Sequence, residues 1–220
     1  MVEGVRELKK RETRRRIAET ALRLFAVHGF DVVTVAEVAK AAGVTEKTVF
    51  NHFETKEDLV YSEDRAFEAE LLESVRTRPA GEPALAAAGR FLLGRYRRLT
   101  IDPASGERAR MFATLVASSP ALRTRERRIH SRYADALCAL IAEEQRAGAG
   151  DLRPRLLAEA LMAVHRESLA MMRAGLLEGT PVDELGPRAV TAARRGLALL
   201  ADGFAGYAAD RPGDASASSS

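Results

Sequence analysis

Residues 34–56 constrain the fold of this chain more than any other stretch, because they encode two short helices joined by a sharp turn. Thr34 precedes an apolar run with Glu37 three residues later, which is the pattern of a capping box at a helix start. Gly43 supplies the backbone freedom that a tight turn requires, and Thr45 is suited to cap a second helix. The stretch therefore predicts a helix-turn-helix, whose second helix normally enters a DNA major groove.

The second of these helices has an apolar side and a polar side. We expect Val49, Phe50 and Phe53 to form the apolar side. The polar side carries hydrogen-bonding side chains suited to base edges and phosphates, namely Thr45, Glu46, Lys47, Thr48, Asn51 and His52. A purely structural helical hairpin would also explain the apolar pattern, but it would not need these polar residues.

Length and composition limit the classes of protein that this chain can belong to. Its 220 residues, 46% of them apolar, can bury a sizeable core as one long domain or as a small domain plus a larger one. The sequence lacks an apolar run long enough to span a membrane and lacks a signal-peptide pattern near its start. We therefore expect a cytoplasmic protein that has no membrane partner and is nucleoid-associated when it is bound to DNA. The single cysteine, Cys138, excludes an internal disulfide and lies in an apolar run typical of a core thiol.

The distribution of charge is more informative than the net charge of +3. Residues 1–56 hold 11 Lys and Arg against 8 Asp and Glu, and the remainder of the chain is balanced. Basic residues such as Arg14 gather before the helix-turn-helix. Such a run fits either a solvated helix face or contact with DNA phosphates, and the neighbouring motif favours the phosphates.

Apolar residues at helical spacing predict an all-α fold of about nine helices, and β-strand signals are missing. The expected helices cover 11–28, 34–41, 45–51, 56–77, 83–99, a short segment ending near 117, 120–147, 153–178 and 187–208. We expect a turn-rich loop at 102–107. The predicted organisation is an N-terminal arm and three-helix DNA-binding domain over 1–55, a helical ligand-binding and dimerisation domain over 56–209, and a disordered tail over 210–220.

The stretch from Arg14 to about Leu59 resembles the DNA-binding domain of the TetR (tetracycline-repressor) family of bacterial regulators. The matching elements are Phe25 with His28-Gly29-Phe30, then Thr34, Val38-Ala39 and Ala42-Gly43-Val44, then Thr45, Thr48-Val49-Phe50-Asn51-His52-Phe53 and Lys56-Glu57-Asp58-Leu59. Two positions depart from the family pattern. Lys47 stands where the family often has glycine, and Phe50 stands where it usually has tyrosine.

The resemblance implies a homodimer that binds a palindromic operator in double-stranded DNA and releases it when a small molecule binds. Thr34, Thr45, His52 and Lys56 would contact phosphates, and Lys47, Thr48 and Asn51 would read base edges. The full predicted DNA-contacting set is Arg14, Thr34, Thr45, Glu46, Lys47, Thr48, Phe50, Asn51, His52 and Lys56. A capping-box pattern at Thr55 and Asp58 would start the fourth helix, which would act as a lever from Lys56 to the ligand module.

The last two helices are expected to form the dimer interface as a four-helix bundle with their symmetry mates. The residues predicted there are Leu161, Val190, Ala193, Gly196, Leu197, Leu200 and Phe204. Packing inside a single subunit is the alternative explanation for the same residues.

The ligand pocket of such a protein would lie between the fourth helix and those that follow it. The residues predicted to line it are Phe67, Met111, Phe112, His165, Arg166, Ser168 and Met172. His165 or Arg166 in a cavity would favour an anionic or polar ligand, and Glu167 would favour a cation. For His165, Arg166 and Glu167, a solvated or interfacial salt bridge is the favoured explanation. For Met111, Phe112 and Met172, core packing explains the pattern as well as a pocket does. The residues from Thr48 to Val60 resemble a branch of the family associated with acyl-coenzyme-A-type ligands.

These observations predict a ligand-responsive repressor that needs no cofactor or metal. Alternatives within regulation are an activator, a ligand-independent DNA binder, or a regulator of lipid metabolism instead of a sensor of exported drugs. An enzyme is poorly supported, because the sequence lacks zinc-ligand spacing, a Gly-rich phosphate loop and a Gly-x-Ser-x-Gly motif.

Overall fold

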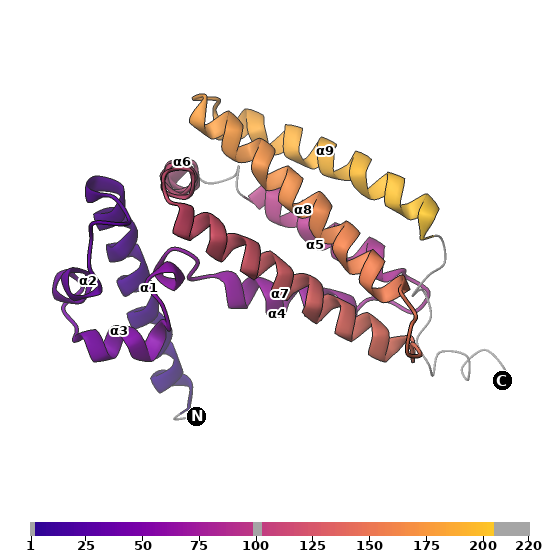
Figure 1. Ribbon diagram of the computed structural model, residues 1–220, viewed down its shortest axis with the longest axis horizontal. Helices are drawn as coiled ribbons and strands as arrows, with labels where there is room; N and C mark the ends of the chain where they lie inside the picture. The colour runs from indigo at the N-terminus through magenta and orange to yellow at the C-terminus, as the bar shows by residue number, and fades with distance from the viewer. Residues whose placement is uncertain (1–2, 99–102, 205–220) are drawn as a thin grey trace. The chain divides into compact units, whose positions relative to one another are not determined.

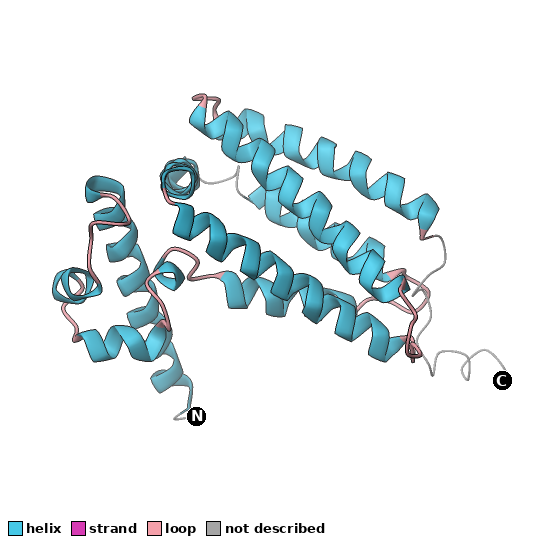
Figure 2. Cartoon of the chain, in the orientation of Figure 1, coloured by secondary structure: helices cyan, strands magenta, loops and turns pink. Residues whose placement is uncertain are grey.

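The computed structural model describes residues 3–98 and 103–204, and its regular structure in those ranges is entirely helical (Figures 1 and 2), which confirms the predicted all-α class. The described elements are α1 (Glu3–His28), α2 (Val35–Ala41), α3 (Glu46–His52), the 3-10 helix η1 (Glu57–Leu59), α4 (Asp64–Arg76), α5 (Ala84–Arg98), α6 (Pro103–Ser118), α7 (Pro120–Glu144), α8 (Arg153–Leu177) and α9 (Val182–Gly203). No helix within the described ranges is long and apolar enough to cross a membrane.

The chain divides into two compact units. The first contains the residues up to Arg65 together with Arg110–Glu126, and the second contains Ala66–Ala109 and the residues from Arg127 onward. This division differs from the boundary expected at residue 55. The end of α6 and the beginning of α7 group with the N-terminal helices, which the sequence pattern did not indicate.

The core of the first unit is formed where α1, α2 and α3 pack together. Ile17 and Phe25 of α1, Val38 of α2 and Val49 of α3 are all buried. Phe25 also meets Phe30 edge to face, with 5.1 Å between ring centroids. The apolar spacing read from the sequence therefore places these helices around one small core.

Residues 110–126 are joined to the helix-turn-helix by specific contacts. The Tyr61 hydroxyl donates a hydrogen bond of 2.9 Å to the Leu122 carbonyl, and the Tyr61 ring meets Phe112 edge to face at 5.5 Å. The Arg125 guanidinium lies 2.5 Å from the Asp58 carboxylate. The segment that follows α3 is thus joined to the beginning of α7.

The second unit is built around α5, α8 and α9, which lie side by side (Figure 1). Leu92 and Tyr96 of α5, Met172 of α8, and Ala189 and Ala193 of α9 form its buried apolar cluster. The small side chains of α9 let it approach α5 and α8 closely. Burial of the apolar cluster then stabilises the packing of the three helices.

Two predicted boundaries were wrong, and each lies near a proline. The segment 102–107, expected to be a loop, contains the start of α6 at Pro103. Proline is well suited to the first helical position, where its missing N–H would have no partner inside the helix. Similarly, α9 begins at Val182 and includes Pro187. Burial of Leu185 and Gly186 against the rest of the unit outweighs the hydrogen bond that Pro187 removes.

Other boundaries also differ from the sequence prediction. The first helix begins at Glu3 instead of residue 11. The expected continuous helix over 56–77 is divided into η1 and α4, so the lever predicted to start at Lys56 is not one rigid helix. Cys138 is partly exposed instead of fully buried. The predicted tail at 210–220 lies outside the described residues, as does the expected end of the last helix at 208.

Candidate DNA-binding interface

A complete capping box fixes the start of α2. The Glu37 carboxylate accepts a hydrogen bond of 2.7 Å from the Thr34 backbone N–H, and the Glu37 N–H donates one of 3.2 Å to the Thr34 hydroxyl. The Thr34 N–H beside it lowers the pKa of the Glu37 carboxyl, so the carboxylate form is favoured. The predicted box is confirmed, and it leaves Thr34 exposed at the helix N-terminus, where an anion is favoured.

A left-handed glycine joins α2 to the recognition helix α3. Gly43 has a φ of +67°, a conformation that side-chain-bearing residues rarely adopt. Two residues later, the Thr45 hydroxyl accepts a hydrogen bond of 3.1 Å from the Thr48 N–H and so caps α3. The turn and the cap together fix where α3 begins.

The outer face of α3 is polar and accessible. Glu46, Lys47 and Asn51 are exposed, and Thr48 and His52 are half-buried. Only Val49 of this helix is fully buried, so Phe50 does not pack inward as the apolar pattern predicted. Phe50 is instead 51% exposed and lies on the outer face beside Asn51. An exposed phenyl ring at this position is suited to apolar contact with a thymine methyl group.

Arg14, predicted to contact a phosphate, also has contacts inside the first unit. Its guanidinium donates to the carbonyl of His52 at the end of α3 and, at 3.1 Å, to the carbonyl of Ser62. It also lies over the Phe53 ring, 4.2 Å from the centroid. These contacts position the end of α3, and the phosphate contact of Arg14 stays a prediction.

Lys56 and Asp58 organise the segment after α3. The Lys56 ammonium lies over the Phe30 ring, 4.6 Å from the centroid, and Lys56 is half-buried. The Asp58 carboxylate accepts a 3.0 Å hydrogen bond from the Thr55 N–H, which confirms one half of the predicted second capping box. The Thr55 side chain does not act as the cap, because the N-cap position of η1 is Lys56 and has no side-chain cap bond.

His52 is held mainly in its neutral form. Burial lowers the pKa of its imidazole, and the positive charges of Arg14 and Lys10 lower this pKa further. A neutral imidazole can donate one hydrogen bond to a phosphate oxygen without contributing a full charge.

Comparisons with known proteins support the same interpretation. Residues 17–61 match the sequence profile of the bacterial regulatory proteins of the tetR family. The HTH-type transcriptional regulator TcmR of Streptomyces glaucescens is 31% identical over 167 residues, which are 74% of this chain and 74% of TcmR. The chain belongs to the TetR family.

Solved structures of TetR-family regulators share its fold. SmeT of Stenotrophomonas maltophilia, in complex with triclosan, has a TM-score of 0.58 at 19% identity, over 86% of this chain and 91% of SmeT. The fatty acid degradation regulator FadR of Bacillus halodurans has a TM-score of 0.55 at 18% identity, over 84% of this chain and 94% of FadR. The chain is thus a transcriptional regulator whose N-terminal helix-turn-helix is the DNA-binding element.

The residues predicted to line a ligand pocket in this TetR-family protein fall into two groups. Met111 and Phe112 belong to the first unit, where Phe112 packs on Tyr61. The others belong to the second unit, and they are Phe67, His165, Arg166, Ser168 and Met172. Their assignment to a ligand site remains a prediction.

Three aromatic side chains surround the buried imidazole of His165, and one of them, Phe67, belongs to the second group. The Nδ1 atom of His165 lies 2.8 Å from the Tyr96 hydroxyl, and the imidazole stacks on Phe67 with 5.0 Å between centroids. His130 meets the same ring edge to face at 5.4 Å. Sequence reasoning found His165 and Phe67 but missed Tyr96 and His130, which lie on other helices.

Burial lowers the pKa of His165 to about 3, and the positive charges of His130, Arg166 and Arg95 act in the same direction. The unfolded chain would protonate near pH 6.5. The neutral imidazole is therefore favoured in the folded state. The contribution of His165 to the free energy of unfolding is fully present above pH 6.5 and is lost as the pH falls towards 3.

We expect this imidazole to make the TetR-family chain acid-sensitive. Wild-type protein should lose about 2 kcal/mol of unfolding free energy between pH 7 and pH 5 through this group. His165→Gln keeps an acceptor for Tyr96 but does not titrate, so its pH slope should be smaller by that amount. Urea unfolding of both proteins at the two pH values measures the difference. Equal slopes would contradict the role of His165.

Three of the seven residues predicted at a dimer interface are buried inside the subunit, and the other four are half-buried. Leu161, Val190 and Ala193 are buried in the second unit of the single chain, so these three predictions were wrong about where the side chains point. At Gly196 an added Cβ would come within 3.0 Å of Val164, which shows that this glycine lets α9 approach α8 of the same chain. Leu197, Leu200 and Phe204 are half-buried.

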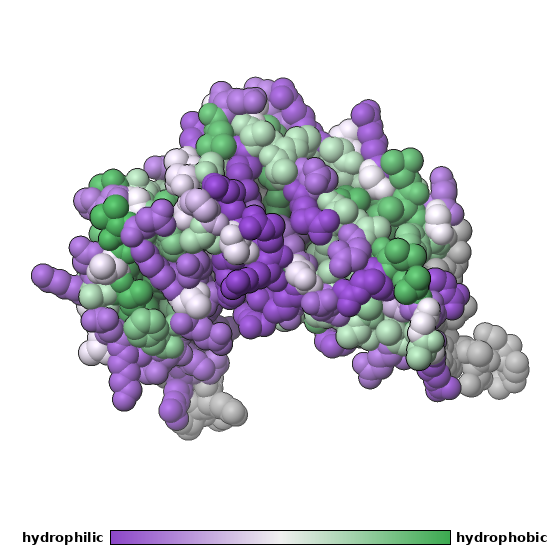
Figure 3. Space-filling model, in the orientation of Figure 1, coloured by the Kyte–Doolittle hydropathy of each residue, from purple (hydrophilic) through white to green (hydrophobic). Residues whose placement is uncertain are grey.

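A different face of α8 is uncovered in this TetR-family chain. It recurs every three or four residues and consists of small and apolar side chains that are exposed or half-buried, namely Leu156, Ala160, Ala163, Ala170, Ala174 and Leu177, with Glu167 among them. On α9, Ala192 and Leu199 are exposed, and Leu199 is 77% accessible. We call these residues of α8 and α9 the alanine face. Pale green and green residues gather on the side of the second unit where α8 lies in front of α5 (Figure 3).

Proposed function

We propose that the protein is a ligand-responsive repressor that binds a palindromic operator as a homodimer in the cytoplasm. The observation that carries this proposal is the outer face of α3, where Lys47, Phe50 and Asn51 are exposed on a helix fixed by Thr45. These side chains offer a donor for guanine, an apolar contact for a thymine methyl group and a bidentate partner for adenine.

The alanine face supports the homodimer. Its alanines occur at helical spacing and allow close approach of a second copy, and an exposed apolar strip of this kind is typical of an interface. In a two-fold dimer, two copies of α3 must lie roughly 34–36 Å apart to occupy successive major grooves. A palindromic operator is the DNA counterpart of that symmetry.

The contacts between the segment after α3 and the start of α7 support ligand control. The pair Asp58–Arg125 and the hydrogen bond from Tyr61 to Leu122 join this segment to α7, which continues to Glu144 in the second unit. A small molecule that prefers one position of α7 would therefore change the position of the segment that follows α3. Release requires that the ligand bind the non-DNA-binding state more tightly.

The relatives leave two kinds of ligand open. SmeT was solved with triclosan, and FadR regulates fatty acid degradation. An efflux-linked drug sensor and a regulator of lipid metabolism are both compatible with the fold. An activator would share the DNA-binding interface, and a ligand-independent DNA binder would be identified by operator binding that no small molecule changes.

The test is a gel-shift titration on the DNA upstream of the gene. Wild-type protein should bind an intact palindrome more tightly than a scrambled one. Lys47→Ala and Asn51→Ala should each cost about 1–3 kcal/mol on the palindrome and much less on scrambled DNA, because they remove base contacts. Arg128→Ala, which removes one positive charge as Lys47→Ala does but at an exposed position of α7, should leave the affinity for both DNAs unchanged. Equal losses on both DNAs would overturn the base-reading role, and binding that ignores the palindrome would overturn the operator proposal.

A further inference from the structure

The helices α8 and α9 run antiparallel with an alignment that two close contacts define. A Cβ added at Gly196 of α9 would lie 3.0 Å from Val164 of α8, and one added at Gly175 of α8 would press against Leu185 of α9. These contacts are eleven residues apart on both helices, in opposite chain directions. Each residue of α9 can therefore be assigned to a level along α8.

This alignment brings two charged residues to nearly the same level. Because an α-helix rises about 1.5 Å per residue, Arg195 of α9 and Glu167 of α8 differ by about 3 Å along the helix axes. By the same alignment, Leu199 lies level with the stretch between Ala160 and Ala163. The leucine is 77% exposed, and the two alanines are half-buried.

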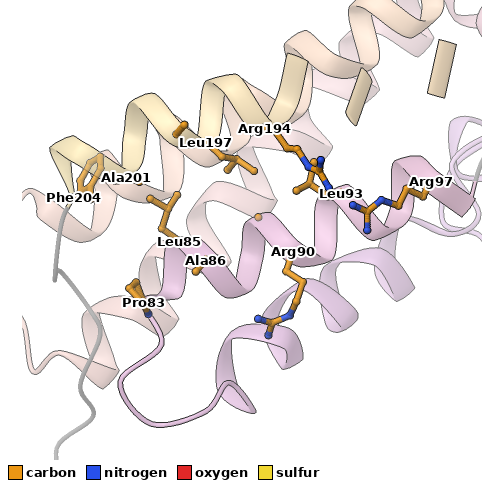
Figure 4. Close-up of a pocket in the computed structure, with 12 residues that line it drawn as sticks. Pro83, Leu85, Ala86, Arg90, Leu93, Arg97, Arg194, Leu197, Ala201 and Phe204 are labelled. Atoms are coloured by element: carbon orange, nitrogen blue, oxygen red, sulfur yellow. The ribbon is translucent and has the colours of Figure 1, made fainter. Parts of the chain in front are cut away.

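Arg195 lies on the side of α9 that carries its part of the alanine face. The side towards α5 instead lines a groove of about 470 Å³, where Arg194 lies near Arg97 at one end (Figure 4). Successive residues on a helix are about 100° apart, so Arg195 lies on a different side of α9 from this groove. It follows Ala192 by three residues and precedes Leu199 by four, which places these three residues together.

Glu167 and Arg195 are exposed charges that are not paired within the subunit. In the described parts of the chain, neither side chain forms an ion pair or a hydrogen bond with another residue. Arg188, four residues before Ala192 on the same side of α9, pairs with Glu184 at 2.9 Å. One uncompensated acid on α8 and one uncompensated base on α9 therefore lie on the same side of the α8–α9 layer.

A second copy of the chain complements this side of the layer in both shape and charge. A two-fold axis parallel to the helices would place α9 of one copy on α8 of the other, antiparallel and at the same level. Leu199 of the partner subunit would then cover Ala160 and Ala163. Arg195 of the partner subunit would lie beside Glu167, and the symmetry would repeat both contacts.

We propose that an ion pair between Glu167 of one subunit and Arg195 of the other selects a second copy of this chain as partner and fixes the register of the two. This rests on the proposed homodimer and names the residues that determine its specificity. Paired opposite charges exclude other registers more than they add affinity. Packing of α8 on α8 would leave Glu167 uncompensated, because the alanine face of α8 contains no Lys or Arg.

The test is an exchange of the two charges, followed by sedimentation equilibrium. Glu167→Arg and Arg195→Glu should each weaken the dimer at least tenfold, because each places like charges opposite one another. The double variant Glu167→Arg with Arg195→Glu restores opposite charges and should recover dimer affinity to within about threefold of wild type. A double variant as weak as the single variants would overturn the proposal.

Two matched controls separate this pair from a general effect of charge. Arg194→Glu makes the same change at the adjacent exposed position, on the groove side of α9. Glu143→Arg makes the other change at an exposed position of α7. Both controls should dimerise as wild type, and circular dichroism checks that every variant folds. Weakening of the dimer by Arg194→Glu as large as that by Arg195→Glu would refute the assigned pair.

Cross-linking tests the register without changing either charge. In a Cys138→Ser background, we expect co-expressed Ala163→Cys and Leu199→Cys chains to form a covalent dimer on mild oxidation. Neither variant alone should do so, because a disulfide requires Cα atoms within about 7 Å and identical positions lie diagonally opposite in this register. A covalent dimer of Ala163→Cys alone would show that α8 meets α8, and this result or no cross-link in the mixture would overturn the register.

The wild-type protein distinguishes failure of this pairing from failure of the proposed function. A wild-type dimer that binds its operator, but whose affinity the double exchange does not recover, refutes the ion pair alone. A wild-type protein that sediments as a monomer refutes the homodimer and the ion pair together. A dimer that recovers on charge exchange but ignores the palindrome in the gel shift retains the ion pair and refutes the operator proposal.

Discussion

Ala170→Glu should convert the proposed dimer to a monomer and reduce affinity for the proposed operator at least about a hundredfold. Ala170 is exposed in the middle of the alanine face of α8, three residues from Glu167. A carboxylate buried there against a second copy, without a partner and beside like charge, costs about 3–5 kcal/mol, and about 2.7 kcal/mol corresponds to a hundredfold change in affinity. A monomer can occupy only one half of a palindrome.

Sedimentation velocity and a gel shift measure this effect directly. The matched control is Ala139→Glu, which introduces the same charge at an exposed alanine of α7 outside the alanine face. This control should remain a dimer with wild-type operator affinity. A dimeric Ala170→Glu protein that binds its operator normally would show that the subunits meet elsewhere.

Asp58→Ala should destabilise the first unit by about 3 kcal/mol. The Asp58 carboxylate is buried, receives the Thr55 N–H at 3.0 Å and pairs with Arg125 at 2.5 Å. Removing one member of a buried pair leaves the other charge without compensation, and this is more costly than losing the pair as a whole. Urea unfolding followed by circular dichroism measures the loss.

A double-mutant cycle isolates the interaction. Asp58→Ala combined with Arg125→Ala should cost at least 1 kcal/mol less than the sum of the single changes, on the order expected for directly contacting residues. The exposed pair Asp135–Arg155 is the comparison, and Asp135→Ala should cost roughly 1 kcal/mol or less. Strictly additive effects of Asp58 and Arg125 would contradict the link between the recognition segment and α7.

Local signals explain why the helix-turn-helix could be predicted in detail. The signals are the capping box of Thr34 and Glu37, the turn at Gly43 and the cap at Thr45. Each acts over three or four residues, and the structure confirms each of them. Capping and left-handed turns depend on neighbouring backbone atoms, so the sequence contains them fully.

Faces of helices were predicted less well, because the identity of a side chain does not say which neighbour covers it. Phe50 is apolar but exposed, and Val190 and Ala193 suited an interface but fill the subunit's own core. Arg14 belongs to a run of basic residues, and its guanidinium donates hydrogen bonds to the carbonyls of His52 and Ser62 at the end of α3 and after it. Each of these outcomes depends on residues that are distant in the sequence.

The sequence alone therefore determined the all-α class, the TetR resemblance and the recognition helix with its caps. Only the tertiary structure decided that residues 110–126 join the DNA-binding unit through Asp58 and Arg125, that α8 presents an uncovered alanine face, and that α5 and α9 enclose a groove with arginines at one end. The physical reason is the range of the interactions. Helix caps and turns are set within one turn of chain, whereas burial, ion pairs and grooves arise where separate helices meet.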